Sequence, residues 1–304
     1  MQGHSRRRYP FHAHAGGIVP AAVAVVLWSL APVLAELARA VPPLQLAAMV
    51  AGVATLATWP ISRFAGHPDG DPVAIPARTW LAGPLLVLGA IGFYFVALRL
   101  APAAEAALVT YTWPVLFVIA AELAQVRRVH INSLAGTIVA FSGAALVLLE
   151  PSDPGGKPAW VGYAFAFASG TCWAAFSLLA RQQPVPLSGI MSRLFGLATL
   201  WAVVGHLLFE QTLWAIAPGE IASTVFIGVG PYGLAFVAWD TALRRGRSAT
   251  VGTLAYAVPI LSALLLIAAG MARIDWRLGI AAVAVVAGCA LASRPRSEPA
   301  AAAA

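Results

Sequence analysis

Long apolar stretches with few charges recur along the whole chain, each about the length that crosses a lipid bilayer. A membrane-spanning helix needs about 20 predominantly apolar residues. Stretches of this kind cover Ile18–Ala38, Pro42–Ile61, Trp80–Leu98, Ala103–Gln125, Ile131–Leu149, Ala159–Leu179, Leu187–Phe209, Glu220–Leu243, Ala249–Ala269 and Trp276–Ala292. None alternates with the period of two residues that marks the strands of an outer-membrane barrel. The pattern therefore predicts an all-α polytopic membrane protein with ten transmembrane helices.

The composition agrees with this prediction. Of the 304 residues, 60% are hydrophobic and 10% are charged, whereas soluble domains have about 45–50% apolar and about 25% charged residues. Cys172 and Cys289 both lie inside predicted spans, where an unpaired cysteine usually acts as a small buried hydrophobe. We assign neither of them a redox role.

Lysine and arginine lie mostly on one side of the predicted spans. With a cytoplasmic N-terminus, the cytoplasmic side carries Arg6, Arg7, Arg8, Arg63, Arg78, Arg127, Arg128, Arg181, Arg193, Arg244, Arg245, Arg247, Arg294 and Arg296. The other side keeps Arg39, Arg99, Lys157, Arg273 and Arg277. Cytoplasmic loops carry an excess of these residues, so we expect both termini in the cytoplasm and a multi-pass protein of the bacterial inner membrane. The net charge of +7 then reflects topology, and we expect no nucleic-acid partner.

The chain repeats itself at an offset of 145 residues. Without any gap, this offset pairs Trp28 with Trp173, Tyr111 with Tyr256 and Pro114 with Pro259, and it also pairs "ALR" at 97–99 with "ALR" at 242–244. The expected organisation is a cytoplasmic segment 1–17, a five-helix repeat 18–149, a linker 150–158, a second five-helix repeat 159–293 and a disordered tail 294–304. Because five is odd, the second repeat enters the membrane from the opposite side. Inverted repeats of this kind are typical of secondary transporters, whose substrate site lies near the midplane between the halves.

These features resemble a known family. Ten spans, an inverted repeat, prolines within spans four and nine and the segment "EAALVTYTWPVLFVIAAEL" at 105–123 are similar to the EamA family of the drug/metabolite transporter (DMT) superfamily. The "YTWP" element and the many Trp and Tyr residues look most like its YddG-type aromatic amino-acid exporters. The resemblance implies a central cavity lined by spans one, three, four, six, eight and nine, with spans five and ten behind it.

The paired prolines are candidate hinges. Pro114 and Pro259 each remove a backbone hydrogen bond, which leaves the carbonyl groups of Thr110 and Ala255 without their helical donors. In hydrocarbon such a group must be satisfied by protein or by a wet cavity. Kinked spans beside a substrate cavity would meet this need, and so would packed kinks healed by a neighbouring hydroxyl. The symmetric placement favours hinges.

Aromatic residues near the midplane are candidate substrate contacts. Trp and Tyr normally gather at the headgroup level, and their rings offer stacking surfaces and cation-binding faces. The candidates are Trp28, Tyr94, Tyr111, Trp113, Trp173, Tyr232, Trp239 and Tyr256. Packing explains any single one of them equally well, and Tyr94 and Trp239 also fit an interfacial belt. Trp113 lies about 200° around an ideal helix from Tyr111, so only a kink lets both face one cavity.

Asp240 is the remaining candidate contact. It shares a helix face with Tyr232 and Phe236, and an ionisable residue within a span is a functional candidate. Arg244 follows one turn later, so an i,i+4 ion pair is the simpler explanation. His206 is expected to be packed. Gly136, Gly143, Gly279 and Gly288 suit close helix packing.

The spans offer no constellation for catalysis, a metal or a cofactor, so a membrane-embedded enzyme is a remote alternative. We expect a secondary transporter that exports small amphipathic metabolites by alternating access, working as a monomer in the bilayer. Its expected substrates are aromatic amino acids, with other neutral amino acids, metabolites or drugs as the alternative. The spans carry no firmly intramembrane Arg or Lys, which argues against phosphorylated substrates.

Overall fold

The computed structural model describes residues 16–64, 75–101, 103–148, 160–268 and 276–294, and within these ranges it contains helices and no strands. The expected linker 150–158 lies outside the described residues, as do nearly all of the expected N-terminal segment and tail. The helices are α1 Ile18–Ser29, α2 Ala31–Leu37, α3 Pro43–Phe64, α4 Ala77–Leu100, α5 Ala103–Thr110, α6 Trp113–Val126, α7 Ile131–Leu148, α8 Trp160–Gln182, the short η1 Leu187–Gly189, α9 Met191–Phe209, α10 Pro218–Ile227, the π-helix η2 Gly228–Leu234, α11 Ala235–Arg245, α12 Ser248–Leu254, α13 Ala257–Ala268 and α14 Arg277–Ala292.

Each predicted span corresponds to one helix or to consecutive helices in line. Among the described residues, 8 helices are long and apolar enough to cross a membrane, and α7 and α14 are shorter apolar helices. The prediction of ten membrane helices is thereby confirmed. The protein is a multi-pass membrane protein.

Several spans are interrupted near their middle. Span four breaks at Tyr111 and Thr112 between α5 and α6, and span nine breaks at Ala255 and Tyr256 between α12 and α13. The break in span four lies two to three residues before Pro114, and the break in span nine lies three to four residues before Pro259. The carbonyl of Ala255 cannot receive its usual i+4 hydrogen bond, because residue 259 is proline, and the amide of Val258 reaches it at 3.1 Å instead. A tighter i to i+3 bond replaces the lost one.

Span one has a break that the sequence pattern does not reveal. Helix α1 ends at Ser29, and α2 begins at Ala31 with Pro32 as its second residue. The carbonyl of Ser29 accepts a hydrogen bond of 2.9 Å from the hydroxyl of Ser262 on α13. No break occurs in α8, the repeat counterpart of this span, which runs unbroken from Trp160 to Gln182. The two halves therefore differ in conformation at this point.

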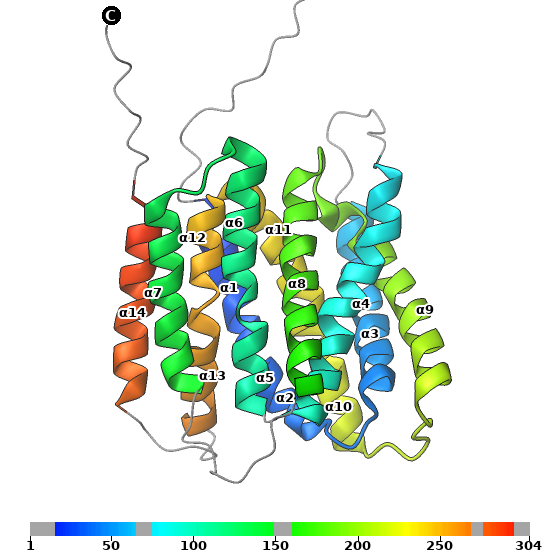
Figure 1. Cartoon of the computed structure of the whole chain (residues 1–304). Coiled ribbons are helices and arrows are strands. Elements are labelled where there is room, and N and C mark those ends of the chain that lie inside the picture. The colour runs from blue at the N-terminus through cyan, green and yellow to red at the C-terminus, as the bar shows by residue number, and fades with distance from the viewer. Residues whose placement is uncertain (1–15, 65–74, 102, 149–159, 269–275, 295–304) are drawn as a thin grey trace, which may run out of the picture.

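The helices pack according to the repeat (Figure 1). Helix α3 packs against its counterpart α9, and α7 packs against its counterpart α14. Helix α4 packs on α8. Their repeat counterparts are α11 and α1, and these two helices pack on each other as well. We call the side at which α1 begins and α14 ends the terminal face, and the side at which α2, α5 and α10 gather the opposite face.

Close contact between α7 and α14 depends on glycine. A Cβ atom added at Gly288 would lie 2.4 Å from the carbonyl oxygen of Gly136 and 2.9 Å from the Cβ of Ala140. Gly143 packs closely in the same way, because a Cβ atom added there would lie 2.6 Å from the Cβ of Ala284. A Cβ atom added at Gly279 would have no neighbouring atom within 4 Å, so the prediction of close packing is wrong for that residue.

Gly288→Ala is expected to destabilise the protein and Gly279→Ala is not. Alanine at 288 would push a methyl group against backbone, and overpacking of this kind costs about 1–3 kcal/mol. Alanine at 279, on the same helix, meets open space and improves helix propensity. Thermal unfolding of the purified variants in detergent measures the difference. Equal melting temperatures for the two variants would contradict the tight α7–α14 contact.

Candidate transport site

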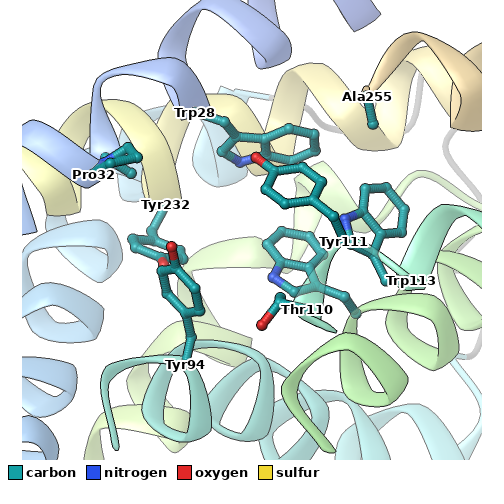
Figure 2. Close-up of a pocket in the computed structure, with 10 residues that line it drawn as sticks. Trp28, Pro32, Tyr94, Thr110, Tyr111, Trp113, Tyr232 and Ala255 are labelled. Atoms are coloured by element: carbon teal, nitrogen blue, oxygen red, sulfur yellow. The ribbon is translucent and has the colours of Figure 1, made fainter. Parts of the chain in front are cut away.

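A pocket lies between the two repeats near the middle of the helices (Figure 2). Its empty space is about 570 Å³, a figure that includes solvent at the open mouth. Six of the residues proposed from sequence line it: Trp28, Tyr94, Tyr111, Trp113, Trp173 and Tyr232. Ala31, Pro32, Thr110 and Ala255 complete the wall. The lining comes from spans one, three, four, six, eight and nine, the set that the family resemblance implies.

Tryptophan rings form one end of the pocket. The ring centroids of Trp28 and Trp173 are 5.3 Å apart in an edge-to-face arrangement, and Trp113 stacks on Trp173 at 5.9 Å. Such pairs are worth about 0.5–1.5 kcal/mol beyond the area they bury. Trp28 and Trp173 occupy equivalent positions in the two repeats, which explains why they meet at the centre. They offer an aromatic surface to a bound molecule.

Tyrosines provide the polar groups of the wall. Tyr94 comes from α4, Tyr111 from the break after α5, and Tyr232 from the π-helix of span eight. All three side chains line the same pocket, and Figure 2 shows the ends of Tyr94 and Tyr232 beside each other. A phenol hydroxyl can both donate and accept. The wall carries no charged side chain, so it suits a neutral or zwitterionic molecule.

The break in span four lets Tyr111 and Trp113 share the pocket. On a straight helix they would point in directions about 200° apart. Because Tyr111 and Thr112 are non-helical, with the amide of Thr112 bonded to Val109 at 3.2 Å, the direction of the side chains changes within two residues. The hydroxyl of Thr110 also bonds to the carbonyl of Ala166 on α8 at 3.2 Å, which ties the break to span six.

Trp239 lies beyond the tryptophan end of the pocket and does not line it. Its ring is fully buried, with its centroid 5.0 Å from that of Trp28 and 5.4 Å from that of Trp113. The indole nitrogen donates a hydrogen bond of 3.0 Å to the hydroxyl of Ser177 on α8. The interfacial position considered for Trp239 is wrong, because the residue lies in the hydrophobic core.

Tyr256 also lies outside the pocket. The residue is fully buried and packs against Phe141 of α7, with ring centroids 5.8 Å apart. Its neighbour Ala255 takes the place on the wall. The sequence places Tyr256 as the equivalent of Tyr111, but the break in span nine includes residue 255, one position earlier than its equivalent in span four, and the two tyrosines face different surroundings.

Asp240 points away from the pocket, towards the terminal face. Its carboxylate accepts the amide of Ser188 at 3.1 Å and lies 3.4 Å from Nε of Arg244. Arg244 in turn donates to the carbonyls of Val185 and Ala180. These bonds fasten the end of span eight to the connection between spans six and seven, which is a structural role. Contact between Asp240 and substrate stays a prediction.

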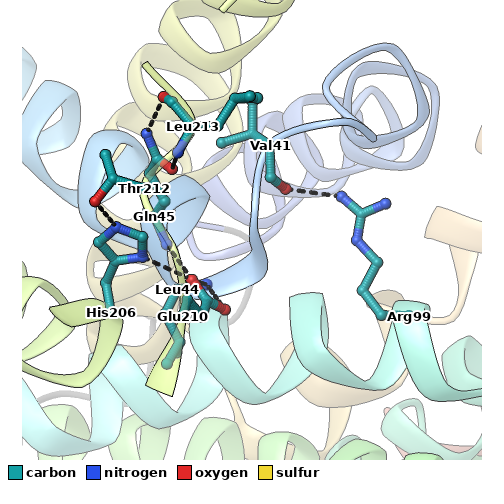
Figure 3. Close-up of polar contacts among 8 residues, drawn as sticks. All are labelled: Val41, Leu44, Gln45, Arg99, His206, Glu210, Thr212 and Leu213. Atoms are coloured by element: carbon teal, nitrogen blue, oxygen red, sulfur yellow. Dashed lines mark hydrogen bonds and ion pairs between the residues drawn. The ribbon is translucent and has the colours of Figure 1, made fainter. Parts of the chain in front are cut away.

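A polar cluster on the opposite face was missed from the sequence (Figure 3). Glu210 accepts the amides of Leu44 and Gln45 at 2.9 and 3.1 Å and binds the ring of His206 at 2.8 Å. The other ring nitrogen of His206 lies 2.9 Å from the hydroxyl of Thr212. A carboxylate at a helix N-terminus is stabilising, so the cluster anchors the start of α3 to the end of α9. A glutamate directly after a predicted span was the available signal.

A family model for EamA-like transporters matches residues 15–149 and again residues 160–294. The two matches are displaced by 160 − 15 = 145 and 294 − 149 = 145 residues, the offset found in the sequence. The chain belongs to the EamA-like transporter family. The two matched segments are the two repeats that enclose the pocket.

Similarity to individual proteins extends over most of the chain. It is 34% identical over 279 residues to the aromatic amino acid exporter YddG of Ancylobacter novellus, covering 89% of this chain and 94% of that protein. A crystal structure with 30% sequence identity superimposes with a TM-score of 0.79 and covers 92% of this chain and 98% of its own. Among the described residues, no group of three or more His, Cys, Asp or Glu could hold a metal ion.

Proposed function

We propose that this EamA-family transporter exports aromatic amino acids through the pocket between its repeats. The observation that carries the proposal is the pocket itself, which combines an aromatic end with tyrosine hydroxyls and has no charged residue on its wall. Rings of Trp28 and Trp173 suit the side chain of the substrate and its ammonium group. The hydroxyls of Tyr94, Tyr111 and Tyr232 suit its carboxylate. The similarity to the aromatic amino acid exporter of Ancylobacter novellus supports this choice.

The proposed setting is the bacterial inner membrane, with both termini in the cytoplasm. The distribution of Lys and Arg supports this orientation. The wall of the pocket includes Ala31 and Pro32 of α2, which lies at the opposite face, so in this orientation the pocket faces away from the cytoplasm, as an exporter requires for release. One chain supplies every residue of the wall, so a monomer suffices. Pro114 and Pro259 serve as hinges beside the pocket.

Cysteines on the two faces test the orientation. Trp214 is 90% exposed on the opposite face and Arg245 is exposed on the terminal face. In a chain with Cys172→Ala and Cys289→Ala, a membrane-impermeant maleimide added to intact cells should label Trp214→Cys and spare Arg245→Cys. Labelling of Arg245→Cys alone would reverse the proposed orientation, and labelling of both would contradict the span assignment.

Ligand-induced stabilisation tests the substrate class. A ligand at 100 times its dissociation constant stabilises the folded state by about 2.7 kcal/mol. We expect phenylalanine and tryptophan to raise the melting temperature of the purified protein. Phenethylamine, which lacks the carboxylate, and hydrocinnamate, which lacks the ammonium, should do so less. Equal shifts with all four compounds would reject recognition of the zwitterion.

A further inference from the structure

Helices α3 and α9 pack along each other at the edge of the molecule, away from the pocket (Figure 1). Helix α3 ends at the terminal face and α9 begins there, so the two helices are antiparallel. A Cβ added at Gly52 would lie 3.8 Å from the side chain of Thr199, and a Cβ added at Gly196 would lie 3.7 Å from that of Thr55. These contacts mark the line along which the helices meet, which we call the α3–α9 seam.

Arg63 and Arg193 lie at the terminal end of the α3–α9 seam. The hydroxyl of Ser62 donates a hydrogen bond of 2.9 Å to the carbonyl of Ser188 and accepts one of 3.2 Å from the amide of Ser192. Arg63 directly follows Ser62, and Arg193 directly follows Ser192. The two arginines therefore stand at the same depth on neighbouring helices, and both are exposed.

Both arginines point to the same side of the seam. At about 100° per residue, Arg63 is turned about 50° around α3 from the residues that touch α9, and Arg193 is turned about 90° around α9 from those that touch α3. The two rotations have the same sense, which on antiparallel helices leads to the same side. The exposed apolar residues on this side are Leu56 and Trp59 of α3 and Leu200 and Val204 of α9. Such a surface faces the lipid.

The terminal end of the seam carries positive charge that no described carboxylate balances. Neither Arg63 nor Arg193 forms an ion pair with a described residue. Helices α3 and α9 contain no Asp or Glu, and the carboxylate of Asp240 is buried against Arg244. The guanidinium group of Arg63 lies over the ring of Trp59, 5.8 Å from its centroid, which holds the cation beside the exposed indole.

The repeat shows that the seam does not need these arginines for packing. At the offset of 145, Arg63 corresponds to Leu208 of α9, and Arg193 corresponds to Ala48 of α3. These counterparts belong to the other end of the same seam, and neither is charged. The fold is therefore built with uncharged residues at the equivalent positions, and the two cations are specific to the terminal end.

We propose that the terminal end of the α3–α9 seam binds one anionic phospholipid. Arg63 and Arg193 bind its phosphate, since the planar guanidinium group suits phosphate oxygens. Trp59 lies at the headgroup level, where tryptophan is enriched in membrane proteins, and an acyl chain follows Leu56 and Leu200 along the seam. Basic sites between transmembrane helices bind anionic headgroups in this way.

A second copy of the chain fits this surface less well. Two copies that share one orientation in the membrane and meet at the α3–α9 seam would bring Arg63 and Arg193 towards the same residues of the partner at the same depth. Like charges in contact repel each other. A phospholipid instead supplies the opposite charge together with an apolar chain. The proposed site lies outside the pocket and goes beyond the proposed transport function.

Native mass spectrometry of the purified protein tests the proposal. The probes are phosphatidylglycerol and phosphatidylcholine with the same acyl chains, mixed in equal amounts. We expect one phosphatidylglycerol to be retained per chain in preference to phosphatidylcholine. Because each basic residue near the surface contributes to this attraction, Arg63→Gln with Arg193→Gln should weaken phosphatidylglycerol binding by about 25-fold. Lysine at both positions keeps the charge and should retain most of the binding.

Arg127→Gln with Arg128→Gln is the matched control. These two arginines follow α6 on the same face and are also exposed, so the variant loses the same charge far from the seam. Its binding of phosphatidylglycerol should be unchanged. An equal loss in the control variant, or equal retention of the two lipids by the unaltered chain, would overturn the proposal.

Two further results would assign the surface to another occupant and reject the lipid. One is displacement of phosphatidylglycerol by inorganic phosphate at equal concentration, which would make the site one for a soluble anion. The other is a dimer that the glutamine variant converts to a monomer. None of these measurements uses phenylalanine, so failure of phenylalanine transport would leave the lipid site standing.

Discussion

Phenylalanine in place of tyrosine at positions 94, 111 and 232 together is expected to weaken substrate binding by about 100-fold or more. The three hydroxyls are polar groups that the wall offers to a carboxylate. Hydrogen bonds to a charged group contribute about 1.5–3 kcal/mol each, so the loss of two already reaches about 100-fold. The rings stay in place, and packing around the pocket is preserved. The measurement is the dissociation constant for phenylalanine from titrated thermal stabilisation or calorimetry.

Tyr163→Phe is the control for the tyrosine variant. This residue packs against Trp160 at the start of α8, with ring centroids 6.0 Å apart, and it does not belong to the pocket wall. Tyr163→Phe also removes one phenol hydroxyl, but it should leave the dissociation constant for phenylalanine unchanged. An unchanged constant in the triple variant would show that the hydroxyls do not bind the substrate and would leave the aromatic end as the source of affinity.

Alanine in place of both Pro114 and Pro259 is expected to lower the transport rate at least about tenfold in a protein that still folds. Without proline, residue 114 regains its amide and can close the helix across Tyr111 and Thr112. Proline in a helix interior costs about 3 kcal/mol, so the straight helix becomes favourable. Tyr111 and Trp113 would then point about 200° apart and could no longer share the pocket. Initial rates of labelled phenylalanine uptake into liposomes measure the effect.

Pro60→Ala provides the comparison for the hinge variant. Pro60 lies within the unbroken helix α3 and is exposed, so its removal should leave the rate unchanged. If the variant with both Pro114→Ala and Pro259→Ala transports at the full rate, the two prolines are packing features and do not act as hinges. A loss of activity with Pro60→Ala as large as that of the double variant would also remove the case for hinges.

The sequence predicts the spans well, because apolar length and charge report the bilayer directly. It also predicts the repeat, since Trp28, Trp173 and the paired prolines fall on one ungapped diagonal. Trp28 and Trp173 meet because equivalent residues close to the twofold axis lie next to each other. The sequence does not show which equivalent residues are that close to the axis, since Tyr111 and Tyr256 are equivalent too and lie in different surroundings.

Other parts of the site depend on local geometry that residue spacing does not encode. Tyr111 and Tyr256 are at equivalent positions in the two repeats. Because the helix break in span nine is displaced by one residue, Tyr111 lines the pocket whereas Tyr256 lies in the hydrophobic core. At the break in span one, the carbonyl of Ser29 accepts a hydrogen bond from Ser262 on a distant span, a contact that residue spacing does not show. Trp239 is buried because the two halves adopt different conformations, and a repeated sequence cannot show which half is open.

Counterflow in liposomes tests the central claim most directly. Liposomes that contain the purified protein are loaded with unlabelled phenylalanine, and uptake of labelled phenylalanine or tryptophan is followed with and without a pH gradient. Saturable uptake that the Tyr94, Tyr111 and Tyr232 triple variant abolishes is the predicted result. A dependence on the pH gradient would add coupling to protons. Absence of saturable uptake of both amino acids, while another small metabolite exchanges, would contradict export of aromatic amino acids.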